Sequence, residues 1–366
     1  MKKKVCILSH GLSNNGIDIF VRNVVTRLDQ SKWDISLILA LNNDGTLQPR
    51  EPEVLEAGVP IYRTTDLGSI KCILIHAGRL YKLLRELKPD VFHSNMDLLN
   101  GINCFVAWAA GVRVRIAHSH NSASQVEAKG GKSVITRIYR LVMRTLAELF
   151  SNRKFACSEP AMMYLFGENW KKKAHTYIIN NGIDTARFSG QVRKEEAGAR
   201  KIVSVGRLSV QKNPLFALEV MDALRRIRTD FVYEWIGDGE LRERMEAAIR
   251  EKGLQDHVKL LGVRNDIEKL LPARDLFFMP SLFEGLPVSL VEAQAAGLPC
   301  LISDTITREV NCGACLFQPL EASPAEWAKV LSGLLDGNHS LHTDPEKLRK
   351  FDISYTIEQL EQVYQG

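Results

Sequence analysis

Short apolar stretches with the length of β-strands alternate with amphipathic, helix-length stretches from one end of the chain to the other. This alternation constrains the fold most, because strands joined by helices pair in parallel and form sheets covered on both faces. The sequence therefore predicts an α/β protein built from doubly wound parallel sheets. The predicted strands are Val5–Ser9, Ile35–Leu41, Val91–Ser94, Val114–Ser119, Phe155–Ser158, Tyr177–Asn180, Ile202–Val205, Tyr233–Ile236, Val258–Leu261, Leu276–Pro280 and Cys300–Ser303.

The chain is too long for one ordinary core, because 366 residues exceed the size at which single cores stop growing. A polar, glycine-bearing segment without periodicity, residues 189–198, separates two groups of predicted strands. We therefore predict a first Rossmann-like domain over residues 1–186, a linker over 187–200 and a second Rossmann-like domain over 201–350. Apolar residues at helical spacing predict a terminal helix within residues 351–366.

Polar residues gather at the predicted carboxyl ends of the strands, where open parallel sheets bind their ligands. In the first domain a loop with Gly16 follows the first strand, and His118 and His120 stand at the end of the fourth. Glycines and basic residues of both domains are therefore expected to face a common cleft. Those of the second domain are Gly206, Arg207, Gly237 and Arg264, the last preceded by Val263.

Glu284 and Glu292 are the most informative residues for function, because they flank a predicted strand–turn–helix junction. Pro287 is expected at the first helical position, and no Ser, Thr, Asp or Asn precedes it as a cap. The backbone N–H groups of Val288 and Ser289 then lack a side-chain partner, and such a helix end suits a phosphate. Carboxylates on either side of a phosphate fit the hydroxyl groups of a nucleotide sugar. The alternative is a buried turn with two solvated glutamates.

Arg207 and Lys212 stand on either side of a predicted strand–helix turn. A guanidinium and an ammonium beside a helix N-terminus suit a diphosphate, although two solvated bases on a loop are the alternative. The stretch Gly237-Asp238-Gly239 begins like a dinucleotide fingerprint but lacks its third glycine, which disfavours a nicotinamide or flavin enzyme. The sequence contains no Asp-x-Asp pair and no metal-binding histidine motif, so we expect no metal.

His118 and His120 stand at the end of the predicted strand Val114–Ser119. Their side chains are expected on opposite faces of the sheet, so that one is a core histidine with satisfied hydrogen bonds and the other faces the cleft. The sequence alone leaves open which of the two does so.

The mildly basic balance of the chain, a net charge of +5 and a pI near 8.7, is too small to predict nucleic-acid binding. In residues 129–154 basic and apolar residues are interleaved, which predicts a basic amphipathic helix that could lie on an anionic membrane surface. A surface helix packed on its own sheet is the alternative. The basic residues are Lys129, Lys132, Arg137, Arg140, Arg144, Arg153 and Lys154.

Seven cysteines lie mostly within apolar runs, which indicates reduced core residues and a cytoplasmic protein. Cys312 and Cys315 form one C-x-x-C motif without a second pair, so neither a zinc site nor a redox centre is expected. The chain has no secretory signal of normal design and no run of 18 uncharged apolar residues. We therefore expect a soluble protein, or one bound peripherally at the inner face of the plasma membrane.

Together these motifs resemble those of the GT-B glycosyltransferases of the retaining family 4, also called glycosyl transferases group 1. The first half is similar to exopolysaccharide- and capsule-type members, and the resemblance covers nearly the whole chain. The most specific motif is the spacing from Glu284 to Glu292. The others are Gly206-Arg207 followed by Lys212-Asn213-Pro214, Gly237-Asp238-Gly239, and Asn181-Gly182-Ile183-Asp184 with Phe188.

The resemblance implies two Rossmann-like domains that face a cleft, with the terminal helix crossing back onto the first. It also implies a role for each candidate residue of the second domain. Arg207 and Lys212 would grip the diphosphate of the donor. Glu284, with the amides of Gly285 and Leu286, would hold hydroxyl groups of the donor sugar.

Further roles follow from the same resemblance. Glu292 would hold the ribose hydroxyls, and the backbone near Val263 and Arg264 would read the base, commonly uracil. In the first domain, Gly16 would let its loop approach the phosphate. His120 would contact the transferred sugar, although relatives carry a His-Asp pair where this chain has Asn after His120.

The implied function is transfer of a sugar, with retention, from a nucleotide-diphosphate donor to a hydroxyl of a glycan or lipid-linked acceptor in cell-surface polysaccharide synthesis. The donor would be a UDP-sugar, a phosphate oxygen of the leaving group would take the acceptor's proton, and no cofactor or metal would take part. One alternative is a GT-B-fold UDP-sugar 2-epimerase. Another is a non-catalytic protein that binds a nucleotide sugar or a membrane.

Overall fold

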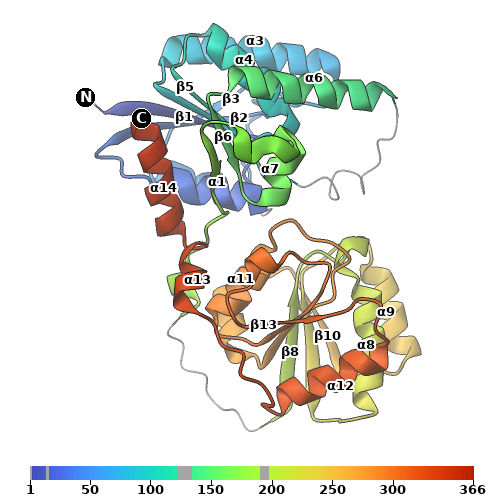
Figure 1. Ribbon diagram of the computed structural model, residues 1–366. Coiled ribbons are helices and arrows are strands. Elements are labelled where there is room, and N and C mark those ends of the chain that lie inside the picture. The colour runs from blue at the N-terminus through green and yellow to red at the C-terminus, as the bar shows by residue number, and fades with distance from the viewer. Residues whose placement is uncertain (1, 14–15, 122–133, 190–197) are drawn as a thin grey trace. The chain divides into compact units, whose positions relative to one another are not determined.

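The computed structural model describes residues 2–13, 16–121, 134–189 and 198–366, and the chain divides into two compact units (Figure 1). Unit 1 comprises Met1–Gly182 and Ile353–Gly366, and unit 2 comprises Ile183–Asp352. The sequence placed the boundaries at residues 186 and 351. The expected linker over 187–200 lies in unit 2, and its residues 190–197 are outside the described part of the chain.

Unit 1 contains a seven-stranded parallel sheet with the order β3-β2-β1-β4-β5-β6-β7. The chain reverses its direction of travel across the sheet between β1 and β4, and such a switch point opens a crevice at the carboxyl ends of the strands. The strands are β1 Lys3–Ser9, β2 Trp33–Leu39, β3 Ile61–Arg63, β4 Val91–Ser94, β5 Val114–Ser119, β6 Arg153–Ala156 and β7 Thr176–Ile178.

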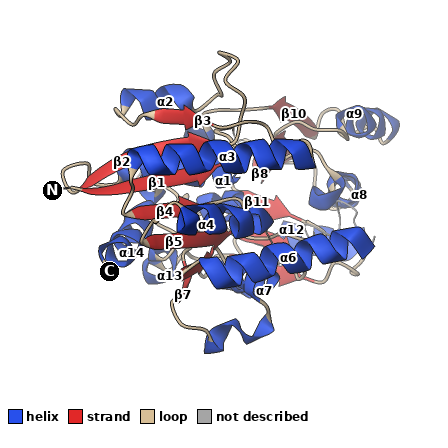
Figure 2. Ribbon diagram, turned by 90° about the horizontal axis from the view of Figure 1, so that it is seen from above, coloured by secondary structure: helices blue, strands red, loops and turns tan. Residues whose placement is uncertain are grey.

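Helices cover both faces of this sheet (Figures 1 and 2). Strand β1 shows why: Val5 and Ile7 pack on the side of α1 and α14, whereas Cys6 and Leu8 pack on the side of α3 and α4. The helices are α1 Gly16–Arg27, α2 Glu51–Glu56, α3 Ile70–Leu87, α4 Asn100–Ala109, α6 Val134–Phe150, α7 Glu159–Phe166 and α14 Ile353–Gln365, with the short 3₁₀ turns η1 Asp97–Leu99 and η2 Glu168–Lys172.

The C-terminal helix α14 belongs to the core of unit 1, far from its neighbours in sequence. Leu360, Val363 and Tyr364 are buried against the apolar side chains of β1 and β2. Trp33 Nε1 donates a hydrogen bond of 3.0 Å to Glu361 Oε1. The apolar residues at helical spacing that predicted a terminal helix therefore form the stripe of α14 that packs on this sheet.

Unit 2 contains a six-stranded parallel sheet with the order β10-β9-β8-β11-β12-β13 and a switch point between β8 and β11. The strands are β8 Arg200–Val205, β9 Phe231–Ile236, β10 Val258–Gly262, β11 Leu276–Met279, β12 Cys300–Ser303 and β13 Cys315–Gln318.

Two apolar cores lie on the two faces of this second sheet. One holds α8, α9 and α12 with Trp235 and Trp327 at its centre, and the other packs α11 against β11 and β12. The helices are α8 Pro214–Arg225, α9 Arg242–Glu251, α10 Ile267–Leu270, α11 Val288–Ala295, α12 Pro324–Leu335 and α13 Pro345–Arg349, with the 3₁₀ turns η3 Thr185–Arg187, η4 Val210–Lys212, η5 Leu271–Ala273 and η6 Arg308–Val310.

All eleven predicted strands are present, with ends shifted by up to two residues. The edge strands β3 and β13 were missed. No helix in the described ranges is long and apolar enough to cross a membrane.

Candidate active site

Three glycines of unit 2 bring the ends of β8 and β9 into direct contact. Gly237 has a φ of +132°, and a Cβ built on it would lie 2.1 Å from the carbonyl oxygen of Gly206. A Cβ on Gly239 would meet the Leu208 carbonyl oxygen at 2.5 Å. Only glycine permits these conformations and approaches, so the Gly237-Asp238-Gly239 motif serves the close packing of two strand ends.

Lys212 and Glu284 form an ion pair in this region. Lys212 Nζ lies 2.7 Å from Glu284 Oε1, and the two side chains are only 15% and 6% exposed. Gln211 Nε2 donates to the other carboxylate oxygen at 3.1 Å, and the Gln211 carbonyl accepts the Leu282 N–H at 2.8 Å. Turn η4 is thus attached to the loop after β11, which places the first glutamate of the motif beside a cation.

Lys212 and Arg207 have different partners, which the sequence did not anticipate. The Lys212 side chain passes over Gly206, since a Cβ there would lie 2.8 Å from Lys212 Cε. Arg207 Nε instead pairs with Glu240 Oε2 at 3.0 Å, and the Arg207 side chain is 73% exposed. The two cations therefore differ in preorganisation: Lys212 is held in place, whereas Arg207 lies largely in solvent.

The helix after the glutamate loop begins one residue later than predicted. Helix α11 begins at Val288, and Pro287 is its N-cap rather than its first helical residue. No side chain caps the helix, as the sequence predicted. The Ser289 hydroxyl donates to the Val205 carbonyl at 3.2 Å, which ties the first turn of α11 to the end of β8. Gly285 is buried, and Leu286 and Val288 are half-buried.

Glu292 lies one helical turn further along α11, in a different environment from Glu284. Burial raises its pKa to about 7; the neighbouring Glu268 carboxylate acts in the same direction, and Arg187 opposes both. Part of the side chain still reaches solvent. Arg187 and Glu268 form an ion pair with one another. Glu292 is therefore a carboxyl group that changes its charge near neutral pH.

The residues expected to read a base lie after β10. Val263 is 66% exposed, and Arg264 makes a bidentate ion pair with Asp266, with distances of 2.8 Å and 2.6 Å. One edge of this guanidinium, formed by Nε and Nη2, is thus engaged by a local partner. The resemblance implies the backbone of this loop as the element that reads the base.

The first loop of unit 1 leads into α1, which begins at Gly16. Asn14 and Asn15 lie outside the described residues. The Asp18 carboxylate is buried and accepts the backbone N–H and the hydroxyl of Ser13, both at 2.7 Å. Asp18 thus holds Ser13 in place.

His120 is buried, with 5% exposure, and its ring is held on both sides. Nε2 lies 2.9 Å from Asn95 Oδ1, and Nδ1 lies 3.0 Å from Asn181 Oδ1. The backbone N–H of His120 donates to the Asp97 carboxylate at 2.8 Å. Burial lowers the His120 pKa, and Asp97 and the bond to Asn181 oppose this shift.

His118 and His120 do not point to opposite faces of the sheet, so that expectation was wrong. Their ring centroids lie 4.1 Å apart, because side chains two residues apart on a strand point to the same face. His118 Nδ1 lies 3.0 Å from Nε2 of His93, whose Nδ1 lies 2.7 Å from the hydroxyl of Tyr364. Burial lowers the His93 pKa to about 3 and the His118 pKa well below its usual value.

The basic stretch predicted as one helix over residues 129–154 is divided between two elements. Helix α6 ends at Phe150, and Arg153 and Lys154 belong to strand β6. Lys154 is buried and pairs with Glu148 at 3.6 Å. Lys129 and Lys132 lie outside the described residues.

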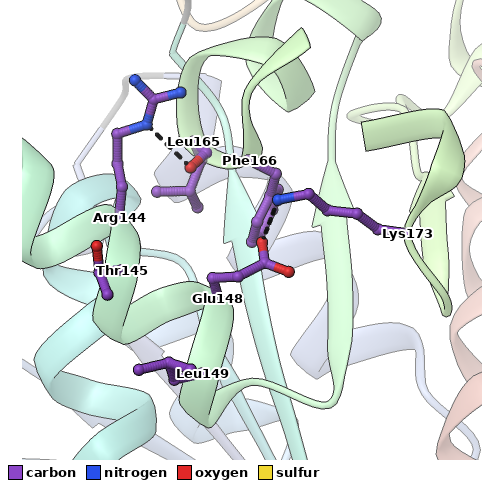
Figure 3. A pocket seen from close by; sticks show the side chains of 7 residues that line it. All are labelled: Arg144, Thr145, Glu148, Leu149, Leu165, Phe166 and Lys173. Atoms are coloured by element: carbon purple, nitrogen blue, oxygen red, sulfur yellow. Dashed lines mark hydrogen bonds and ion pairs between the residues drawn. The ribbon is translucent and has the colours of Figure 1, made fainter. Parts of the chain in front are cut away.

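A pocket of about 240 Å³ lies beside α6 (Figure 3), and its lining includes none of the candidate donor-binding residues. Its charged groups are paired within the protein: Arg144 Nε donates to the Leu165 carbonyl at 3.2 Å, and Lys173 Nζ lies 2.6 Å from Glu148 Oε2. Its lining residues are Arg144, Thr145, Glu148, Leu149, Leu165, Phe166 and Lys173.

The cysteines are free thiols, and all but Cys72 are buried. In the parts of the chain that the structure describes, no three His, Cys, Asp or Glu side chains are grouped so that they could hold a metal ion.

Within each unit, several residues that hold candidate side chains in place were not predicted. Gln211 precedes Lys212, and Asn95 follows the end of β4, where a polar residue of an α/β sheet is itself a signal. Asn181 was noted only as part of a domain-exit motif. Tyr364, 271 residues from His93, has no local signal.

Two family models match the chain over overlapping regions. "Glycosyltransferase Family 4" matches residues 14–187, and "Glycosyl transferases group 1" matches residues 168–311.

Curated relatives match over much of their length. The putative glycosyltransferase EpsF of Bacillus subtilis (strain 168) is 32% identical over 343 residues, which cover 90% of this chain and 87% of EpsF. The capsular polysaccharide biosynthesis glycosyltransferase CapH of Staphylococcus aureus is 26% identical over 78% of this chain and 79% of CapH. A UDP-Gal:alpha-D-GlcNAc-diphosphoundecaprenol alpha-1,3-galactosyltransferase of Escherichia coli is 31% identical over 65% of this chain and 62% of that protein.

Among solved structures, Alr3699/HepE of Anabaena in complex with UDP aligns with a TM-score of 0.77 over 100% of both chains, at 17% sequence identity. This likeness concerns the fold.

Proposed function

The chain belongs to the GT-B glycosyltransferases of group 1 and family 4, and we propose that it transfers a sugar, with retention, from a UDP-sugar to a hydroxyl of a glycan or lipid-linked acceptor in cell-surface polysaccharide synthesis. The observation that carries the donor half of this proposal is the Lys212–Glu284 ion pair beside the uncapped start of α11. A cation and a carboxylate held 2.7 Å apart suit a phosphate and a sugar hydroxyl that are joined in one ligand.

The choice of uridine draws on the relatives. The E. coli relative is named for a UDP-galactose donor, and HepE was solved with UDP. Glu292 supports a nucleotide donor, because a carboxylate can accept hydrogen bonds from two neighbouring ribose hydroxyls.

In the proposed reaction the protein stabilises the departing diphosphate electrostatically. Lys212 is already held close to the expected diphosphate before a donor binds, because Gly206 leaves room for its side chain and Glu284 positions its ammonium group. The amides at the start of α11 and the exposed charge of Arg207 would add to this stabilisation. Loss of one preorganised contact of this kind costs about 3–4 kcal/mol of barrier, which corresponds to roughly two to three decades in rate.

Retention is proposed to occur without a protein nucleophile. Glu284 is held by Lys212 and Gln211, which suits recognition of hydroxyl groups better than attack on the sugar. The acceptor hydroxyl would approach the face that the diphosphate leaves, and a phosphate oxygen would take its proton. His120 would contact the transferred sugar through a ring that Asn95 and Asn181 orient.

The acceptor and the setting are also proposals. A lipid-linked acceptor is named for the E. coli relative, and a capsular polysaccharide for the S. aureus relative. Seven free cysteines support a reducing, cytoplasmic location. We propose that turnover needs no divalent ion, since Lys212 and Arg207 can offset the diphosphate charge; excess chelator should then leave the rate unchanged.

The test is a donor screen on the full chain. UDP-sugars are incubated with and without a polyprenyl-diphosphate-linked sugar, and UDP release and the glycoside are measured. Lys212→Ala should lower the rate by about a hundredfold or more, whereas Lys329→Ala, an exposed lysine on α12, should leave it unchanged. Isomerisation of the donor without an acceptor would instead indicate an epimerase, and binding without consumption of any donor would contradict the proposed enzyme.

A further inference from the structure

Helices α3, α4 and α6 lie side by side over one face of the unit 1 sheet (Figure 2). Helix α4 contacts both of the others. Each sends one stripe of side chains into the core; Leu84 of α3, Val106 of α4 and Ala147 of α6 are examples. The opposite stripes lie on the outer side of the three helices, and we call this side the α3–α4–α6 face.

This face is apolar where a surface helix of a globular protein is normally polar. On α6 the outward stripe at helical spacing contains Ile138, Leu141 and Leu149, which are 57%, 67% and 68% exposed. Ile70 and Leu74 on α3 are 80% and 65% exposed. Among the described residues, 12 of the 19 large apolar side chains that are exposed lie on these three helices, so the surface is not a random scatter.

Aromatic rings add to the face. Trp108 is 52% exposed, and its ring centroid lies 5.1 Å from that of Phe150 and 6.0 Å from that of Phe105. Tryptophan favours the boundary between water and hydrocarbon, because its ring is apolar and its N–H is polar.

The charges on the same helices are mostly positive. Seven basic residues stand against the acids Glu86 and Glu148, and Glu148 is already paired with Lys154 and Lys173. The basic residues are Lys71, Arg79, Lys82, Arg85, Arg137, Arg140 and Arg144. Exposed apolar side chains interspersed with basic ones suit the surface of a lipid bilayer, where an apolar acyl layer lies beneath anionic head groups.

We propose that the α3–α4–α6 face docks unit 1 on the surface of an anionic lipid bilayer. Its apolar side chains would enter the boundary between head groups and acyl chains, and its Lys and Arg side chains would contact lipid phosphates. A second copy of the chain is a poorer occupant, because two such faces would bring like charges together. The proposal goes beyond glycosyl transfer, and it extends the surface well past the one helix that the sequence indicated.

The test is co-sedimentation of the full chain with vesicles of phosphatidylglycerol mixed with phosphatidylcholine, and with vesicles of phosphatidylcholine alone. Wild type should prefer the anionic vesicles by about tenfold or more at low salt, and high salt should weaken this preference. The triple variant Ile138→Glu/Leu141→Glu/Leu149→Glu should partition at least about tenfold less, since burial of these side chains supplies much of the affinity.

A matched control carries the same change in charge elsewhere. Leu47→Glu/Leu55→Glu/Ile227→Glu also replaces three exposed apolar residues, and it should bind like wild type to within about twofold. Equal losses in the two triple variants, or no preference of wild type for anionic vesicles, would overturn the proposal. So would a wild-type dimer in sedimentation velocity that only the face variant dissociates, because the face would then lie between two copies. Co-sedimentation measures binding to vesicles and does not require enzymatic turnover. The membrane proposal and the proposed glycosyl transfer can therefore fail independently.

Discussion

Lys212 Nζ lies 2.7 Å from Glu284 Oε1, and the two residues belong to different loops at the switch point of the unit 2 sheet. Without a donor, each neutralises the other. A diphosphate would compete for Lys212, and the donor sugar would offer hydroxyl groups to Glu284. This exchange of partners is the centre of the proposed function, and it explains why a carboxylate lies where a diphosphate is expected to bind.

The ion pair should matter for stability before any ligand is added. Lys212→Met leaves the nearly buried Glu284 carboxylate without a cation, so we expect a loss of about 2–4 kcal/mol in the free energy of unfolding, measured by urea denaturation. The double variant Lys212→Met/Glu284→Gln should recover most of the lost free energy of unfolding. Lys252→Met is the control, because its partner Glu219 is 49% exposed, and such pairs contribute about 0–1 kcal/mol. Equal losses in the two lysine variants would rule out a special role for the buried pair.

Glu292 should make stability depend on pH. Because the folded-state pKa is raised to about 7, above the ordinary value of 4.5, the protonated form favours folding. This contribution is fully present below pH 4.5 and is lost as the pH rises through 7. As the pH rises from 5 to 8.5, the free energy of unfolding of Glu292→Gln should therefore increase by roughly 2–3 kcal/mol relative to that of wild type, measured by urea denaturation. A difference between the two proteins that does not change with pH would show that Glu292 ionises normally.

Gly237 should tolerate no side chain. Gly237→Ala places a Cβ 2.1 Å from the Gly206 carbonyl at a positive φ, so β8 and β9 must separate. We expect a loss of at least about 3 kcal/mol in stability, together with weaker UDP binding. Gly337→Ala also has a positive φ but open space around its Cβ, and it should cost only about 1 kcal/mol. Thermal unfolding and calorimetric titration distinguish the two, and similar effects in both variants would contradict the close approach.

Tyr364→Phe should loosen the C-terminal helix. The variant removes the hydroxyl that lies 2.7 Å from His93 Nδ1 and leaves a fully buried imidazole nitrogen without a partner. The expected cost is about 1–3 kcal/mol, with faster amide hydrogen exchange in α14. Tyr81→Phe alters a surface tyrosine and should change neither measurement. Unchanged exchange in α14 of the Tyr364 variant would show that the hydroxyl does not hold this helix.

Much of the fold could be predicted because most of its interior strands are short, largely apolar runs between helix-length stretches, and Val91–Ser94 and Val114–Ser119 agree to the residue. The edge strand Ile61–Arg63 was missed because three residues that are half-buried carry no period-two signal. The other missed strand, Cys315–Gln318, overlaps the C-x-x-C motif, which drew attention to metal and redox chemistry instead.

The site was predicted in its residue types rather than its contacts. Spacing identified Glu284, but its pairing with Lys212 joins residues 72 positions apart through tertiary packing. Arg207 was expected to share the diphosphate, and only the structure shows its preference for Glu240. The histidine prediction failed because the two-residue period of a strand was misapplied to His118 and His120.

Calorimetric titration of the full chain with UDP, and with the UDP-sugar that it consumes, tests the exchange of partners most directly. Lys212→Ala should weaken both ligands by about 10- to 100-fold, since it removes a charged hydrogen bond to the diphosphate. Glu284→Gln should weaken only the UDP-sugar and should leave UDP binding unchanged or stronger, because Lys212 is then free. UDP affinity of Lys212→Ala within threefold of wild type, or equal weakening of UDP and UDP-sugar by Glu284→Gln, would contradict the account.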